Sequence, residues 1–266
     1  MVNLIMMICA VAATGAIYLI FQTLSWWWLL PVLIGAYLAA VVAYWLVIIV
    51  AWFFLPSSKK RVEKPIPICT AMIRLTAEWF CSITRLRLHL KQEKELPNEP
   101  CVMVCNHISF FDPMVMIALS KGRKLVCVSK EENKKIPLAG RYLNGACFLF
   151  VDRSNPRQAV QMLQRAGEEM KHLGVDVVIY PEGTRSKTGK LTRFKEGGFV
   201  LAKQADAPIA VYTVKGTDQV KKKFPFRSTK VTLELIEIID KDTVRSMDAK
   251  ALAQYTHDIV GEALEE

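Results

Sequence analysis

His107 and Asp112 are the side chains of this sequence whose types and spacing best suit acid–base chemistry. They lie in the segment NHISFFDP at residues 106–113. Their spacing does not place both on one face of a helix, so a turn must bring them together. A carboxylate that accepts from an imidazole fixes its tautomer and raises its basicity. His107 is therefore a candidate general base that deprotonates an alcohol attacking an acyl thioester, with Asp112 as its partner.

Each residue of this segment also has a structural interpretation. Asp112 precedes Pro113, which is typical of a helix N-cap and first helical residue. Both roles can coexist if one carboxylate oxygen caps the helix and the other accepts from His107. Ser109 is an alternative nucleophile, but it lacks a nucleophile-elbow pattern, and we expect a turn residue. A lone histidine is often structural, so the assignment of His107 depends on the clusters that follow.

A second chemical cluster is the run YPEGTRS at residues 180–186. Gly183 lets a ligand approach the backbone closely, and the guanidinium of Arg185 can donate two parallel hydrogen bonds. A phosphate is therefore the expected ligand. Gly183, Gly189 and Lys190 imitate a P-loop, but their spacing is one residue too long and Leu191 replaces the hydroxyl residue. This pattern disfavours nucleotide hydrolysis.

Short apolar runs that alternate with helical patterns must position these clusters. This alternation predicts an α/β fold with a mainly parallel sheet flanked by helices. The helix expected over 155–174 has Pro156 in its first turn, Gly174 as its stop, and a stripe of Val160, Leu163, Ala166 and Met170. The expected strands cover residues 85–90, 102–105, 125–128, 147–151, 175–180, 209–214 and 231–239, and a closing helix covers 248–264.

Polar residues directly follow four of these runs: Asn106-His107, Lys130, Asp152-Arg153 and Glu182 to Ser186. Ligands of open parallel sheets bind outside the carboxyl ends of the strands, so we expect these groups to share one crevice. Lys130, Arg153 and Arg185 together predict a site for a phosphate ester.

The first 58 residues contain no Asp, Glu, Lys or Arg. Apolar stretches over about 2–21 and 29–55 meet the roughly 20 residues that a bilayer span needs. They predict a transmembrane helical hairpin, with Trp26 to Trp28 at one membrane surface. The alternative of a cleaved signal peptide is disfavoured because a charged n-region and a convincing cleavage site are lacking.

The net charge of +10 belongs to the rest of the 266-residue chain. Lys59, Lys60, Arg61 and Lys64 follow the second span, which predicts a multi-pass cell-membrane protein with its catalytic domain on the cytoplasmic side. Contact with anionic membrane lipids explains the basicity, while nucleic-acid binding is disfavoured because no such module is recognisable. We expect three parts: a hairpin at 1–58, a juxtamembrane segment with an amphipathic helix (66–84) and first strand at 59–100, and a catalytic domain at 101–266.

The seven cysteines show no C-x-x-C spacing and no partnering histidine cluster. The sequence therefore suggests no metal site. Several cysteines fall in apolar runs, where a free thiol behaves as a small buried hydrophobe.

These motifs resemble the lysophospholipid acyltransferase family, most closely the bacterial 1-acyl-sn-glycerol-3-phosphate acyltransferases. Asn106, His107 and Asp112 match its NHxxxxD motif, and residues 182–186 match EGTRS. Residues 150–153 match the motif of an aromatic and a branched residue before arginine, although Cys147 replaces its glycine. Residues 194–197 match FKxG. The late proline motif is half present, because Val211 replaces the second proline.

The resemblance implies a glycerolipid acyltransferase-like fold with no cofactor. It implies an acyl-CoA or acyl-carrier-protein donor, lysophosphatidic acid as acceptor and phosphatidic acid as product. His107 and Asp112 are the implied catalytic pair. The expected substrate-binding residues are Asn106, Lys130, Arg153, Glu182, Gly183, Thr184, Arg185 and Lys195.

Other functions remain open at the level of sequence. Glycerol-3-phosphate, other lysophospholipids or lyso-ornithine lipids are alternative acceptors for proteins with similar motifs. A non-catalytic membrane protein that binds phospholipid headgroups would need the basic residues but not His107. A membrane-attached phosphatase or nucleotidase ranks last, because metal-ligand carboxylates and a proper P-loop are lacking.

Overall fold

The computed structural model describes residues 2–22, 25–120, 122–152, 156–186 and 188–265. Its contacts divide the chain into two compact units, Met1–Ser57 and Ser58–Glu266. Residues 59–100, set apart from the catalytic domain by sequence, contribute a helix and a strand to the second unit.

The first unit consists of two apolar helices, α1 (Val2–Ile20) and α2 (Leu29–Phe54), with a 3-10 turn η1 (Trp26–Trp28) before α2. They agree with the two expected spans. Both are long and apolar enough to cross a membrane, and most of their side chains are not buried within the protein. Tyr37 of α2 donates a hydrogen bond to Asn3 of α1 at 2.7 Å. These features suggest association with a membrane.

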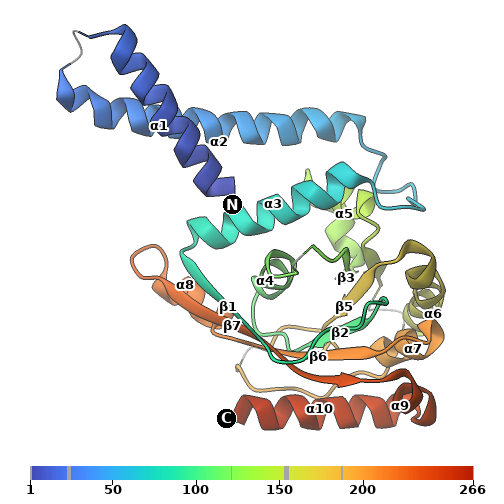
Figure 1. The fold of residues 1–266 in the computed structure, drawn as a ribbon. Coiled ribbons are helices and arrows are strands. Elements are labelled where there is room, and N and C mark those ends of the chain that lie inside the picture. Colours follow the sequence, from blue (N-terminus) through green and yellow to red (C-terminus); the bar gives the residue numbers. More distant parts are fainter. Residues whose placement is uncertain (1, 23–24, 121, 153–155, 187, 266) are drawn as a thin grey trace. The chain divides into compact units, whose positions relative to one another are not determined.

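A seven-stranded mixed sheet organises the second unit (Figure 1). Its order is β1-β7-β6-β2-β5-β3-β4, and β6, β2, β5, β3 and β4 run parallel to one another. Only β7 is antiparallel to its neighbour β6, and β1 is parallel to β7. The expectation of a mainly parallel sheet is confirmed. The strands are β1 (Leu86–Gln92), β2 (Val102–Cys105), β3 (Leu125–Lys130), β4 (Leu149–Val151), β5 (Asp176–Ile179), β6 (Ile209–Lys215) and β7 (Thr229–Ile239).

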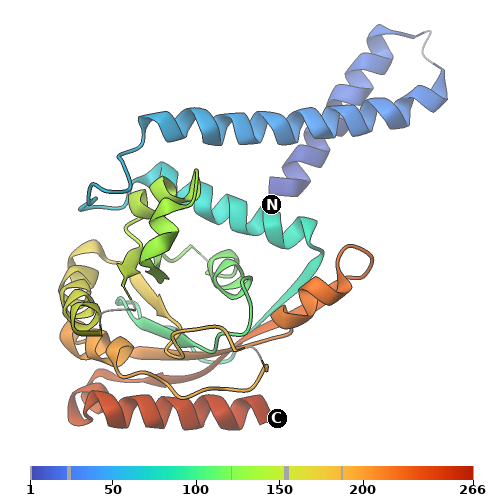
Figure 2. The same cartoon turned by 180° about the vertical axis from the view of Figure 1, so that it is seen from behind.

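Helices cover both faces of this sheet, as Figures 1 and 2 show from opposite sides. The longer ones, α3, α6 and α10, lie close to the ranges expected from the sequence. The helices are α3 (Pro67–Ile83), α4 (Asp112–Ala118), α5 (Ala139–Gly145), α6 (Pro156–Leu173), α7 (Gly197–Ala205), α8 (Val220–Lys223), α9 (Lys241–Ser246) and α10 (Ala249–Glu265), with 3-10 turns η2 (Glu131–Lys135) and η3 (Thr217–Gln219).

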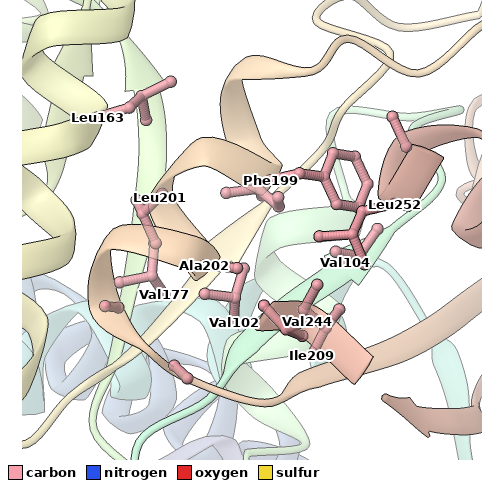
Figure 3. Close-up of a cluster of buried hydrophobic side chains, with 14 of the residues drawn as sticks. Val102, Val104, Leu163, Val177, Phe199, Leu201, Ala202, Ile209, Val244 and Leu252 are labelled. Carbon is pink, nitrogen blue, oxygen red and sulfur yellow. The ribbon is translucent and has the colours of Figure 1, made fainter. Parts of the chain in front are cut away.

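Alternate residues of the central strands belong to two separate cores. Val102 and Val104 of β2 pack with side chains of α6, α7 and α10 (Figure 3). Met103 and Cys105 face the other way and pack with α3 and α4. Since successive side chains of a strand point to opposite faces, a strand covered by helices on both sides must be apolar throughout. This requirement explains the uninterrupted apolar runs.

Most thiols are part of these cores, as the sequence predicted. Burial raises the pKa of Cys81 and of Cys127 to about 12, so both thiols stay protonated at neutral pH. They therefore act as small apolar side chains, not as nucleophiles.

Cys147, which replaces the glycine of the motif that this sequence resembles, adopts a left-handed backbone with φ of +60°. It follows the C-cap of α5, Ala146, and its N–H donates to the carbonyl of Asn144 at 2.9 Å. A residue with a Cβ in this conformation costs about 1–2 kcal/mol, which glycine avoids. Position 147 therefore has the backbone conformation that favours glycine, although a cysteine occupies it.

We expect Cys147→Gly to be more stable than Cys147→Ala by about 1 kcal/mol, because only alanine keeps the left-handed strain. Both substitutions remove the hydrogen bond from Cys147 Sγ to the carbonyl of Val62, so the comparison isolates the backbone. Thermal unfolding in detergent measures the difference. Equal stability, or a more stable alanine variant, would show that the position carries no strain.

Candidate active site

The carboxyl end of β2 holds His107 against Asp112. His107 Nδ1 lies 2.8 Å from Asp112 Oδ2. The Asp112 side chain is fully buried, whereas 15% of the His107 side chain is exposed. A carboxylate only accepts hydrogen bonds, so we assign the proton to Nδ1, which leaves the lone pair on Nε2. The turn inferred from the spacing of these residues is present.

Asp112 braces the turn and does not cap its own helix. Its Oδ2 also accepts from the backbone N–H groups of Ile108 and Ser109, at 2.8 and 2.7 Å. α4 begins at Asp112 itself, and no side chain caps its first turn. The prediction that Asp112 caps the helix was therefore wrong. The reason is that both carboxylate oxygens are engaged by groups other than the N–H groups of α4.

The other carboxylate oxygen is held by Thr217, a residue that sequence reasoning missed. Thr217 Oγ1 donates to Asp112 Oδ1 at 2.5 Å, and Thr217 is 1% exposed. It follows β6, which is parallel to β2 and ends at the same edge of the sheet. A polar residue two positions after the end of a strand was the signal that could have identified it.

The EGTRS segment fixes the backbone of His107. Glu182 Oε1 accepts from the N–H of His107 at 2.6 Å, and the N–H of Ser186 donates to the carbonyl of His107 at 2.8 Å. Glu182 Oε2 accepts from the N–H and hydroxyl of Thr192, at 3.2 and 2.7 Å. The structure thus gives Glu182 a positioning role, and its contact with substrate stays a prediction.

Tyr180 supports the imidazole from one side. The two ring centroids lie 4.4 Å apart at a tilt of 31°. Burial raises the pKa of Tyr180 well above its usual value, so the phenol is neutral at physiological pH. Its aromatic face fixes the orientation of His107. The sequence showed Tyr180 only as the first residue of a motif and did not predict this role.

Asn106 joins β2 to β6 beyond the end of the ladder. Its side-chain nitrogen donates to the carbonyl of Val214 at 3.1 Å, and its oxygen accepts from the N–H of Val214 at 2.7 Å. The residue is 1% exposed. The amide therefore aligns two strands that carry His107 and Thr217, and binding of substrate by Asn106 stays a prediction.

Gly183 of the EGTRS turn lies directly against the side chain of Lys195. Its φ is +74°, and a Cβ there would lie 2.8 Å from Lys195 Nζ. The turn therefore needs glycine for its left-handed backbone, and the end of the Lys195 side chain lies directly against it. Thr184 and Arg185 of the same turn are exposed. Arg185 and Lys195 thus offer two accessible cationic side chains beside the turn that holds His107.

The other two predicted phosphate ligands lie further along the sheet or outside the described residues. Lys130 is exposed at the carboxyl end of β3, which neighbours β5, and pairs with Glu132 at 2.7 Å. Such exposed pairs contribute little, so Lys130 remains free to bind another anion. Arg153 lies outside the described residues. Among those described, no group of three or more His, Cys, Asp or Glu side chains is placed to hold a metal ion.

Comparisons with known proteins cover the segment that carries this candidate site. A family model described as Acyltransferase matches residues 87–215, which include both motifs. Human 1-acyl-sn-glycerol-3-phosphate acyltransferase beta is 35% identical over 178 residues, which cover 65% of this chain and 63% of that protein. Over this region the chain is therefore similar to the 1-acyl-sn-glycerol-3-phosphate acyltransferases.

Two further comparisons extend this result. A Saccharomyces cerevisiae 1-acyl-sn-glycerol-3-phosphate acyltransferase is 32% identical over 149 residues, covering 54% of this chain and 49% of that protein. The chain thus spans less than two thirds of the length of these two curated relatives. The crystal structure of the Thermotoga maritima 1-acyl-sn-glycerophosphate acyltransferase, PlsC, has a TM-score of 0.57 at 22% identity, with 84% of this chain and 87% of that chain covered. This likeness confirms the acyltransferase fold.

Proposed function

We propose that this protein is a lysophospholipid acyltransferase that transfers a fatty acyl group to the free hydroxyl of lysophosphatidic acid and forms phosphatidic acid. The observation that carries the proposal is the buried Asp112 carboxylate on His107 Nδ1, which leaves Nε2 as a base. The backbone of His107 is hydrogen-bonded to the EGTRS turn, which contains Arg185 and whose Gly183 adjoins Lys195. The donor is an acyl-CoA or an acyl-carrier protein, and no cofactor is required.

In this mechanism Nε2 of His107 accepts the proton of the acceptor hydroxyl. The hydroxyl oxygen attacks the thioester carbonyl, and the carbon–sulfur bond breaks as the ester forms. The imidazolium returns its proton to the departing thiolate. Asp112 remains ionised and stabilises the imidazolium without accepting its proton. No covalent enzyme intermediate is needed, because the thioester is already activated.

The acceptor phosphate is bound by Arg185 and Lys195, with Lys130 and Arg153 as further cationic ligands. Thr184 supplies a hydroxyl in the same turn. Charge-assisted hydrogen bonds from a guanidinium suit a phosphate monoester, which offers several acceptor oxygens. Glu182 and Gly183 shape the turn that presents these groups.

A headgroup-binding protein without catalysis is the competing function. It would use the same cations but would need neither a base nor a carboxylate to orient it. The four hydrogen bonds that Asp112 accepts favour the enzyme, because they hold one imidazole in one orientation.

Product analysis tests the proposal directly. The purified full chain is supplied with acyl-CoA or acyl-carrier protein and with lysophosphatidic acid, glycerol-3-phosphate, other lysophospholipids or lyso-ornithine lipid. We expect phosphatidic acid as the main product. If another acylated lipid is the main product, the acceptor is not lysophosphatidic acid. Binding of lysolipid without any product would favour the headgroup-binding function.

Arg185→Ala is expected to weaken use of a phosphate-bearing acceptor by roughly ten- to hundredfold, since a charge-assisted hydrogen bond contributes about 1.5–3 kcal/mol. Arg185→Lys should restore part of the loss. Arg193→Ala is the matched control, because Arg193 is a highly exposed arginine of the following loop. Wild-type kinetics of Arg185→Ala with lysophosphatidic acid would exclude the phosphate role.

We also propose that both termini and the catalytic unit lie on the cytoplasmic side of the cell membrane, with α1 and α2 as a two-span hairpin. The charge-free first region and the basic residues at 59–64 support this orientation. A C-terminal tag should resist protease in intact cells and be cleaved after permeabilisation. Cleavage in intact cells would show that the C-terminus lies on the opposite side of the membrane from the one proposed. Cys101 and Cys127 are buried, so labelling of native thiols is not a suitable measurement.

A further inference from the structure

The connection between β6 and β7 presents exposed aromatic and basic side chains together. We call residues 220–228 the basic-aromatic loop. Phe226 is 86% exposed and Phe224 is 46% exposed. Its charged side chains are all basic, with no acid in the range. They are Lys221, Lys222, Lys223 and Arg227.

This loop has a defined backbone, so its aromatic side chains are held outward. The N–H of Phe224 bonds the carbonyl of Val220, and the N–H of Arg227 bonds that of Lys223, both at 2.9 Å. Arg85 Nη1 donates to the carbonyl of Pro225 at 3.3 Å. Within the described parts of the chain, none of the loop's four cations forms an ion pair. The fold therefore leaves Phe226 almost wholly exposed and the four described charges without an ion pair.

The loop lies at the same edge of the sheet as the catalytic pair. β6 is parallel to β2, so the carboxyl ends of both strands meet at this edge. Thr217, which holds Asp112, lies between β6 and α8, the helix with which the loop begins. Figures 1 and 2 show the loop after α8 projecting beyond the sheet. Phe110, in the turn between His107 and Asp112, is also 57% exposed.

We propose that the basic-aromatic loop docks on an anionic lipid bilayer, with Phe226 inserted at the boundary between headgroups and acyl chains. Amphipathic segments with basic residues and exposed aromatic side chains bind this boundary, and basic residues near it gain from the negative surface potential. A protein partner with an acidic surface would also satisfy the lysines. The bilayer is favoured because Phe226, which is 86% exposed, has a wholly apolar side chain.

Docking at this edge would bring the edge of the sheet that carries His107 toward the lipid headgroups. The docking does not depend on the proposed acyl transfer, because it rests on residues outside the catalytic and phosphate sites. It also provides a membrane contact in the second unit that is separate from α1 and α2.

Site-directed fluorescence of the full chain in lipid nanodiscs tests the proposal. An environment-sensitive dye is attached at Phe226→Cys and, as the matched control, at Ser246→Cys. Ser246 is exposed at the end of α9, beyond the carboxyl end of antiparallel β7 and hence at the opposite edge of the sheet. The signal of labelled wild type is subtracted to remove the native cysteines. Quenchers attached to lipid and dissolved in water report the position of each dye.

In nanodiscs that contain phosphatidylglycerol, we expect lipid-borne quenchers to act several-fold more strongly at position 226 than at position 246. Dissolved iodide should show the reverse order. Because Phe226 is exposed, its substitution should leave the fold intact, and Phe224→Cys provides a second reporter. Equal access of iodide to positions 226 and 246 would overturn the proposal. Shielding of position 226 only after an acidic carrier protein is added would also overturn it, in favour of a protein partner.

The lysines are tested by Lys221→Gln, Lys222→Gln and Lys223→Gln combined with the Phe226→Cys reporter. Each lysine near an anionic surface shifts the ratio of docked to free loop by about fivefold, so the triple variant should lower it roughly a hundredfold. Nanodiscs without anionic lipid should have a similar effect on the unsubstituted lysines. Lys250→Gln, an exposed lysine of α10, is the control. Docking that is indifferent to all three lysines and to anionic lipid would overturn the electrostatic part of the proposal.

Discussion

Replacement of His107 by alanine is expected to lower acyl transfer by about 10²–10⁴-fold, the usual cost of removing a general base. If chemistry limits turnover, most of this loss appears in kcat, and the affinity for lysolipid changes little. The phosphate ligands proposed above lie on other segments, so they should still bind the acceptor. Single-turnover kinetics and lysolipid binding by the same preparation measure the two effects separately.

The fold should tolerate His107→Ala. The substitution removes one of the four donors to Asp112, while those from Ile108, Ser109 and Thr217 remain. Thermal unfolding should therefore stay near that of wild type. His89→Ala is the control, because His89 is exposed on β1 and should not affect transfer. Full turnover by folded His107→Ala would refute the mechanism and favour the headgroup-binding function.

Asp112→Asn is expected to lower kcat by several orders of magnitude, up to the roughly 10⁴-fold that the same substitution costs in a serine protease triad. The asparagine oxygen can take the place of Oδ2 and accept from His107, Ile108 and Ser109. Its NH₂ group then faces Thr217, whose hydroxyl can rotate to accept. Hydrogen bonding and fold can therefore persist, while the negative charge that stabilises the imidazolium is lost.

Asp112→Ala provides the structural contrast. It leaves the buried hydroxyl of Thr217 and the N–H groups of Ile108 and Ser109 without their acceptor, at about 1–3 kcal/mol for each group that remains unpaired. We therefore expect Asp112→Ala to be unstable as well as inactive, and Asp112→Asn to be inactive but near wild type in thermal unfolding. An Asp112→Asn variant with full activity would show that the carboxylate serves only to brace the turn.

Much of the fold could be predicted because its signals are local. The uninterrupted apolar runs of β2 and β5 arise because both sheet faces are covered, and the stripe of α6 follows the helical period. Leu163, Ala166 and Met170 of that stripe are indeed buried, while the side chain of Val160 lies outside those described. The motif around His107 and Asp112 likewise occupies one continuous segment, so its spacing alone predicted a turn.

The precision of the site depends on contacts between distant segments. Glu182 holds the backbone of His107, Tyr180 lies against its ring, and Thr217 holds Asp112. Sequence analysis assigned Glu182 to substrate and gave the other two no role. Hydrophobic periodicity records which face of an element is buried, but not which polar atoms meet when strands pair.

By itself, the sequence determined the charge-free apolar region, the alternation of strands and helices, and the residue types of both motifs. Only the tertiary structure decided the strand order, the use of both Asp112 oxygens away from α4, and the place of the basic-aromatic loop beside the site. The physical reason is that patterning arises from neighbours along the chain. Hydrogen-bond partners are instead selected where β2, β5 and β6, far apart in sequence, end at one edge of the sheet.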